Sequence, residues 1–217
     1  MDLAGEGRGA RHQVVPDAAS SEYAARAMSP RTKARFAQSV LAEIAALSPE
    51  IAHAVRARSG DAWQRIEKAL PMEWIEEATY NAVIDATRAE LGDEAFRALF
   101  RRMGRRLIKT PLFQALIEAV IRISGLSPHT LLKAVPRARD AAVAESGTLT
   151  YERAGDRCAR LFLRDFPPST FRSGATVLLL SGTWLGLVDI AGHEATAQLD
   201  LEDVNLERGR ATFVLRW

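Results

Sequence analysis

ATAQLDLE at residues 195–202 and RATFVLRW at residues 210–217 alternate apolar and polar side chains with a period of two. This period is typical of β-strands that bury one face and expose the other. It places Leu199, Leu201, Phe213 and Trp217 on the buried face. Because residues 205–209 supply turn-forming side chains between the two segments, the sequence predicts an antiparallel hairpin here.

A second predicted hairpin precedes this one, and an apolar segment joins the two. Residues 148–153 and 157–166 show strand patterns, and Pro167 ends the second strand because proline cannot donate a hydrogen bond to a sheet. Residues 171–190 follow and carry no charge between positions 174 and 188. Since a membrane-spanning helix needs about 20 apolar residues, this segment predicts a helix buried against the sheet and no membrane span.

Three glycines, Gly174, Gly182 and Gly186, lie roughly on one side of that predicted helix. Each glycine costs a helix about 1 kcal/mol relative to alanine, so we expect a compensating contact. One interpretation is close packing of the helix on the sheet, because small residues permit a close approach of two backbones. The alternative is that the missing side chains leave room for a ligand.

Helical periodicity replaces the strand pattern before residue 147. A hydroxyl side chain followed by proline, which is typical of helix starts, begins at positions 29, 48, 110 and 127. Apolar residues recur at helical spacing over 71–91, from 93 onward and over 111–124. These patterns predict an α+β fold, in which an N-terminal helical layer packs on a C-terminal four-stranded antiparallel sheet of ββαββ order.

The composition suits one compact domain, because 217 residues with 47% hydrophobic content can bury a sizeable core. We expect a flexible tail at 1–28 and a single domain at 29–217, with a helical part at 29–146 and the ββαββ part at 147–217. Cys158 is the one cysteine and allows no internal disulfide, and no secretory signal is evident. These features predict a cytoplasmic protein.

The sequence contains no strong pattern of catalytic or metal-binding residues. The four histidines at 12, 53, 129 and 193 are far apart, and none has the spacing of a metal site. His129 is the best candidate among them, because it follows Ser127 and Pro128 at the opening of a predicted helix. No nucleophile elbow or P-loop is present, so the sequence favours a protein that is not an enzyme.

Positive charge gathers on one predicted helix, although the whole chain carries a net charge of only +2. Opposite the apolar stripe of the helix that begins at Asp93 lie Arg97, Arg101, Arg102, Arg105, Arg106 and Lys109. Such a face could hold phosphates or an acidic partner, and the alternative is a solvated face that complements the negative helix C-terminus. Because no aromatic residues interleave with the arginines, nucleic acid is an unfavoured partner.

Several short segments together resemble a known group of sequences. They are Trp74, Leu91-Gly92, MGRR at 103–106, LLK at 131–133 and TFVLRW at 212–217. From about residue 74 to residue 217 the chain resembles an uncharacterised paralogous family of myxobacterial proteins, classed as a domain of unknown function.

In its order of elements, that family is similar to a wider group with vinyl-reductase-type ligand-binding domains, haem nitric-oxide-binding domains and vesicle-tethering TRAPP subunits. The resemblance implies helices before a C-terminal α/β half and, in several members, an apolar ligand between layers. The haem branch uses a Tyr-x-Ser-x-Arg motif and a proximal histidine. Neither Tyr80 nor Tyr151 begins such a motif, and His129 precedes the first predicted strand. We therefore expect no cofactor, with haem disfavoured.

The residues and the resemblance together predict a non-enzymatic regulatory or sensory domain that binds a small apolar ligand. The predicted site lies between the helices at 111–124 and 171–190. Its candidate residues are Leu116, Val120, Leu178, Trp184, Leu185 and His129. Two alternatives stay open: a protein–protein adaptor that acts through the Arg-rich helix face or as a homodimer, and a tetrapyrrole reductase-like enzyme.

Overall fold

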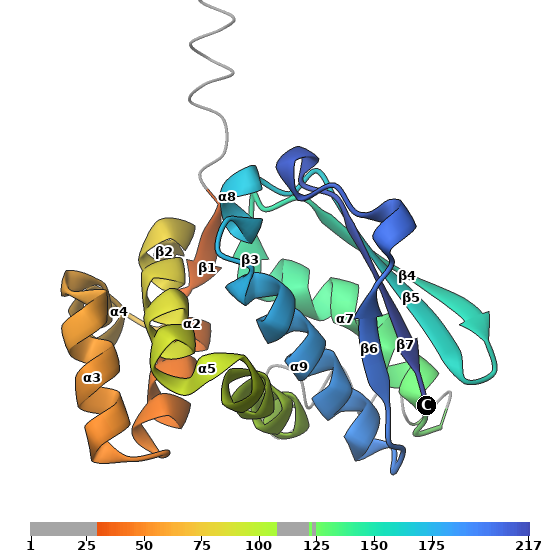
Figure 1. Cartoon of the computed structure of the whole chain (residues 1–217), viewed down its shortest axis with the longest axis horizontal. Coiled ribbons are helices and arrows are strands. Elements are labelled where there is room, and N and C mark those ends of the chain that lie inside the picture. The colour runs from red at the N-terminus through yellow and green to blue at the C-terminus, as the bar shows by residue number, and fades with distance from the viewer. Residues whose placement is uncertain (1–29, 108–121, 123–124) are drawn as a thin grey trace, which may run out of the picture.

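The computed structural model describes residues 30–107, 122 and 125–217, which form an α+β fold with two antiparallel sheets (Figure 1). The N-terminal half contains the helices α2 (Ala34–Ala45), α3 (Pro49–Ser59), α4 (Asp61–Lys68) and α5 (Glu77–Leu107). The C-terminal half contains α7 (Pro128–Ala142), α8 (Pro168–Phe171), α9 (Ala175–Ile190) and a four-stranded sheet. The predicted fold class is confirmed. The predicted tail at 1–28 and the predicted helix at 111–124 lie outside the described residues.

The four-stranded sheet has the order β4-β5-β7-β6 and is antiparallel throughout. Its strands are β4 (Thr148–Gly155), β5 (Cys158–Arg164), β6 (Thr196–Leu199) and β7 (Ala211–Arg216). On its buried face Leu161 of β5 pairs with Phe213 of β7, and the ring of Trp184 from α9 meets Phe213 edge-on at 4.8 Å. Both predicted hairpins are therefore present, and α9 packs across them.

The end of β6 differs from the prediction. Leu201 is 82% exposed and lies in the short 3-10 helix Leu201–Asp203, so its predicted burial is wrong. The strand ends at Leu199 because the Asp200 side chain accepts a hydrogen bond from the backbone N–H of Glu202 and turns the chain. This turn brings Asp203 back toward β7.

Asp203 connects the turn to the sheet through three neighbours. Its carboxylate accepts hydrogen bonds from the Thr212 hydroxyl at 2.5 Å and from Arg164 at 2.6 Å, and Arg210 lies 2.5 Å away. The hydroxyl first, and then the two arginines, lower the pKa of Asp203 to about 2.

This lowered pKa predicts a pH-dependent contribution to stability. It is present above the unfolded carboxyl pKa of about 3.9 and is lost as the pH falls from there toward the folded value. We expect Asp203→Asn to lower the thermal midpoint at neutral pH, and the difference from wild type to shrink below about pH 4. Thermal denaturation of both proteins across this range measures the effect. A difference that does not change with pH would contradict it.

The apolar segment forms an interior helix as predicted, but the helix begins later. Residues 168–171 form the separate turn α8, and α9 starts after Gly174, whose φ of 71° breaks the helix. A Cβ built on Gly186 would lie 2.1 Å from the Arg101 carbonyl oxygen, and one on Gly182 would lie 2.6 Å from that of Arg97. The close approach is therefore between α9 and α5, whereas the sequence interpretation placed it between the helix and the sheet.

A small second sheet, not predicted from the sequence, joins the two halves. It has the order β2-β1-β3, with β1 at Arg31–Lys33, β2 at Trp74–Glu76 and β3 at Val143–Ala144. The predicted helix over 71–91 accordingly begins only at Glu77, because the preceding residues pair with β1. The strands of this sheet have only two or three residues, too few for a period of two to be recognised. They hold the end of α7 beside the start of α5.

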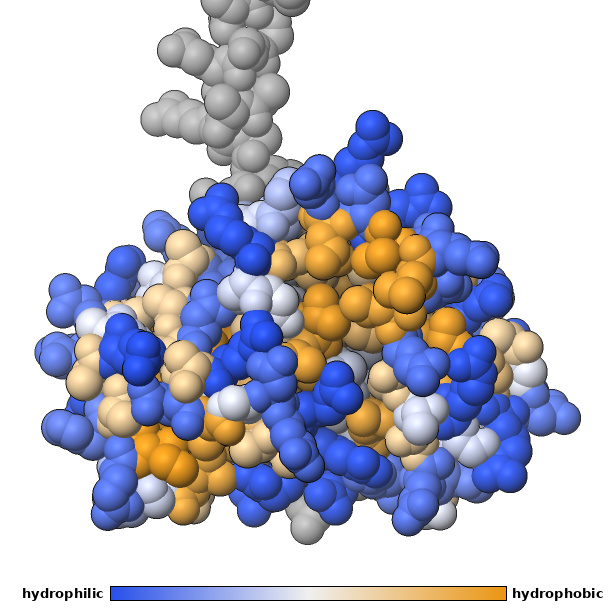
Figure 2. Space-filling view, in the orientation of Figure 1, coloured by the Kyte–Doolittle hydropathy of each residue, from blue (hydrophilic) through white to orange (hydrophobic). Residues whose placement is uncertain are grey.

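The surface agrees with this arrangement of layers. Figure 2 shows hydrophilic residues over much of the visible face and a hydrophobic area near α9 and β6. Val177, Leu199 and Leu206 are half-buried and pack against the C-terminal core. Within the described ranges, the search for a helix long and apolar enough to cross a bilayer found none.

Candidate functional site

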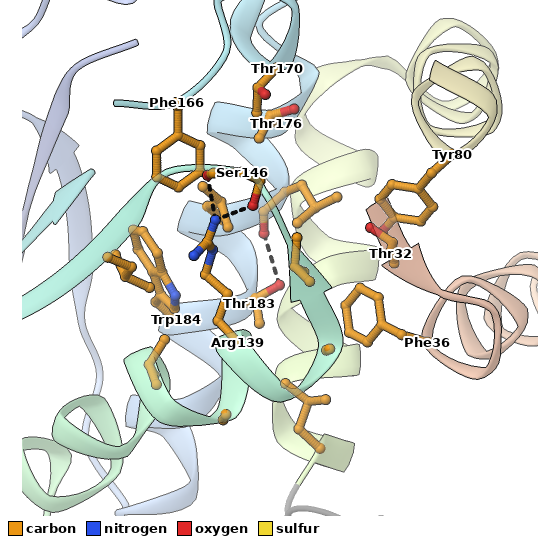
Figure 3. Close-up of a pocket in the computed structure, with 18 of the residues that line it drawn as sticks. Thr32, Phe36, Tyr80, Arg139, Ser146, Phe166, Thr170, Thr176, Thr183 and Trp184 are labelled. Carbon is orange, nitrogen blue, oxygen red and sulfur yellow. Dashed lines mark hydrogen bonds between the residues drawn. The ribbon is translucent and has the colours of Figure 1, made fainter. Parts of the chain in front are cut away.

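A cavity of about 160 Å³ lies between the N-terminal helices and the C-terminal half. Its walls come from β1, α2, α5, α7, α9 and the residues after α7 (Figure 3). Most of its surface is apolar, contributed by side chains that include Phe36, Leu131, Leu149, Phe166, Leu180, Trp184 and Leu187. Because an apolar cavity of about 150 Å³ can hold benzene, this one is large enough for a single-ring molecule.

Arg139 places a cation in this apolar wall. Its side chain is 13% exposed, and the guanidinium stacks over the Phe166 ring at 4.6 Å. It donates hydrogen bonds to the Gly147 carbonyl at 3.1 Å and to the Ser146 carbonyl at 2.5 Å, as Figure 3 shows for Ser146. Its one ion pair among the described residues is to Asp140, at 3.4 Å, and that side chain is 69% exposed. The cation is therefore buried without a buried counter-ion in contact, and burial lowers the pKa of Arg139.

Glu77 adds a carboxyl group to the same cavity. Both of its oxygens accept from the Thr170 hydroxyl, at 2.9 and 3.0 Å. Burial raises the pKa of Glu77, while the Thr170 hydrogen bond and the charge of Arg139 act in the opposite direction. The carboxyl group is thus already bound within the protein, and Arg139 is the group with binding capacity to spare.

Tyr80 contributes a polar atom that has no partner. The residue is 7% exposed, lies on α5 and lines the cavity, and its ring contacts Phe36 at 6.2 Å. Among the described residues no group hydrogen-bonds to its hydroxyl, which is fully buried. Burial raises the pKa of Tyr80. Figure 3 shows that Tyr80 and Arg139 approach the cavity from opposite sides.

The six ligand-binding residues predicted from the sequence do not form one group. Trp184 lies in the cavity wall, whereas Leu185 is buried elsewhere and Leu178 packs against the N-terminal core. Leu116 and Val120 lie outside the described residues. The sixth, His129, is also away from the cavity wall.

His129 is held by two hydrogen bonds at the edge of the sheet. Its Nε2 lies 3.0 Å from the Asp156 carbonyl oxygen, which can only accept, so Nε2 donates. In the neutral ring Nδ1 then accepts from the Tyr151 hydroxyl at 2.6 Å. Trp217 packs edge-on against the ring at 4.7 Å. Both nitrogens are occupied in this network, so the ring has a structural position.

Part of the Arg-rich face holds α5 against α9. Arg101 donates two hydrogen bonds to Asp189 of α9, at 2.7 and 2.6 Å, and Arg105 lies 3.5 Å from the same carboxylate. Arg106 pairs with Glu43 of α2. Arg97 is exposed and Arg102 half-buried, and Lys109 lies outside the described residues. A role of this face in binding an acidic partner stays a prediction.

The sequence interpretation missed Arg139, Glu77 and Tyr80, although a signal for them existed. Arg139 follows Leu131 and Val135 at successive intervals of four, so it continues the apolar stripe of its helix. Glu77 and Tyr80 are three residues apart, on the buried side of α5. A charged residue within an apolar stripe is the pattern that could have indicated this cavity.

Comparison with known proteins identifies the fold and no close relative. No protein-family model and no curated protein matches the chain. Among solved structures, a mutant of T. Tengcongensis H-NOX is 12% identical with a TM-score of 0.56, over 85% of this chain and 96% of that one. Fe(II) unliganded H-NOX from K. algicida is 10% identical with a TM-score of 0.58, over 85% and 95%. A structure titled for heme redox potential and porphyrin distortion is 12% identical with a TM-score of 0.55, over 85% and 94%.

These neighbours confirm similarity to the H-NOX fold, while membership of a myxobacterial family stays a prediction. They also overturn the expectation of no cofactor with haem disfavoured, because the printed descriptions of proteins with this fold name heme and Fe(II). That expectation rested on a missing motif and an unsuitable histidine. A short motif reports one way of holding a cofactor, whereas the fold determines whether a cavity exists.

Proposed function

We propose that this chain is a sensory domain that binds a haem-type tetrapyrrole in the cavity between its two halves. The observation that carries the proposal is Arg139, a buried cation in an apolar wall with no buried counter-ion in contact. Buried charges in proteins are normally paired, so a ligand that brings a carboxylate would complete the site. The H-NOX neighbours support a tetrapyrrole as that ligand.

The cavity residues fit the chemistry of such a group. Apolar walls that include Phe36, Leu149 and Trp184 suit a porphyrin ring, and Arg139 suits one of its acidic side chains. A bound haem would supply an iron centre able to bind a diatomic gas. The protein would exclude water from that centre and fix the position of the ring.

The cavity volume adds a requirement to this proposal. A porphyrin is several times larger than benzene, whereas about 160 Å³ suits a single ring. Binding therefore requires α2 and α5 to separate from α7 and α9. Such a rearrangement is a physical means by which a ligand could change the surface seen by a partner.

The proposal is tested with two forms of the same metal-free porphyrin. We expect the wild-type protein to bind protoporphyrin diacid at least about tenfold more tightly than its dimethyl ester, because only the diacid can pair with a buried arginine. Titration followed by porphyrin fluorescence gives both dissociation constants. Equal affinities, or no binding of either form, would contradict the proposal.

A pair of arginine variants on one helix provides the matched test. Arg139→Gln should raise the dissociation constant of the diacid by about tenfold to a hundredfold. Arg137→Gln, on the exposed side of α7, should leave it unchanged. Thermal melts of both variants show whether each is folded, and the ester titration gives the same information without any substitution.

The volume favours a second candidate, a single-ring aromatic acid in place of the porphyrin. It would use the same arginine and need no separation of the helices. Thermal melts with benzoate and with benzene distinguish it, because an acid-specific stabilisation without porphyrin binding supports the smaller ligand. The action of residues 29–217 as one domain, the cytoplasmic location and a protein partner stay predictions.

A further inference from the structure

The hydroxyl of Tyr80 is the least explained polar atom in the cavity. Its residue is buried on α5, and no described group donates to it or accepts from it. Buried hydroxyls are nearly always hydrogen-bonded, because leaving one without a partner is costly. A phenylalanine would fill the same volume without this cost, so the oxygen itself calls for an explanation.

The described part of the cavity wall offers few other groups that could bind iron. It contains no histidine, cysteine or methionine. His53 and His193 are exposed, and His129 is bonded to Tyr151 and Asp156. The Glu77 carboxylate, the other anionic oxygen group in the wall, is already bound by Thr170. Tyr80 is thus the donor of suitable chemistry that the wall leaves free.

We propose that Tyr80 is the axial ligand of ferric haem in this protein. The inference rests on the proposed function, because it requires a haem in the cavity. Tyrosine is an established ligand of haem iron, and its anionic oxygen suits the ferric ion better than the ferrous ion. Arg139, which approaches from the opposite side of the cavity, adds positive charge that favours an anionic oxygen.

Coordination exchanges one bond for another without electron transfer. The O–H bond of Tyr80 breaks, a bond between the oxygen and ferric iron forms, and the proton is released to the solvent. Without iron the phenolate is disfavoured, because burial raises the pKa of Tyr80. A bound cation reverses this preference. Haemin affinity should therefore increase with pH, with release of one proton for each haemin bound.

The experiment compares haemin with metal-free protoporphyrin in the full chain. We expect Tyr80→Phe to weaken haemin binding by about tenfold or more and to remove the phenolate-to-iron charge-transfer absorption. The affinity for metal-free protoporphyrin should not change, because that ligand makes no bond to the oxygen. Tyr151→Phe, which removes a hydroxyl away from the cavity, should leave both ligands and the haemin spectrum unchanged.

A second variant keeps the test valid if the first disturbs the cavity. Tyr80→His should bind haemin with the absorption spectrum of an imidazole-ligated iron, because the ligand changes while its position is kept. If Tyr80→Phe binds haemin with the wild-type spectrum, Tyr80 is not the ligand, although the proposed function stands. If the wild-type protein binds neither haemin nor metal-free protoporphyrin, both proposals are overturned.

Discussion

Replacement of Gly186 by alanine is expected to lower the free energy of unfolding by about 3 kcal/mol or more. The new Cβ would lie 2.1 Å from the Arg101 carbonyl oxygen, 2.9 Å from the Arg105 backbone nitrogen and 3.0 Å from the Gly104 Cα. All three contacts are with backbone atoms of α5, which cannot rotate away as a side chain can. The two helices would have to separate, and the bidentate pair of Arg101 with Asp189 would be strained.

Chemical denaturation of the variant measures this loss. Gly155→Ala is the matched control, because a Cβ there meets its nearest atom, the Cys158 Cβ, at 3.7 Å, which is ordinary contact. The control should change the free energy of unfolding by no more than about 0.5 kcal/mol. Equal stability of the two variants would show that α5 and α9 are not in close backbone contact.

Removal of the Trp184 side chain should have an effect of similar size. Trp184 is 1% exposed and lies between the Phe213 ring and the cavity. Truncation of a buried tryptophan to alanine costs about 3–5 kcal/mol, because apolar contacts are lost and a void remains. Trp184→Ala should therefore be strongly destabilised in chemical denaturation and should enlarge the ligand cavity.

A ligand-rescue measurement makes this second prediction specific. Indole, which has the shape of the deleted ring, should raise the thermal midpoint of Trp184→Ala more than that of the wild-type protein. Trp74→Ala is the control, because Trp74 is only half-buried and stacks with Lys33 at 3.7 Å at the edge of the small sheet. Its loss of stability should be smaller and should not respond to indole. A large effect at Trp74 with little at Trp184 would contradict the described core.

The candidate site could be predicted only in part from the sequence. Trp184 was selected because it belongs to an apolar helix, and it does line the cavity. Arg139 and Tyr80 were not selected, because a single charged or aromatic residue at helical spacing is common on many helices. Their importance depends on distance from residues such as Phe166 and Phe36, which lie on other elements. Sequence periodicity gives the face of a helix but not what that face meets.

The sequence by itself determined the secondary structure of the C-terminal half and the α+β class. Alternation over 195–202 and 210–217, and the uncharged segment before them, are local signals, because strand and helix periods depend on neighbouring residues. Tertiary structure alone decided that Gly186 meets α5, that Thr32 pairs with β2 and β3, and that Arg139 and Tyr80 share a cavity. Each of these contacts joins segments far apart in the chain, so its energy depends on the packing of whole elements and leaves no local pattern.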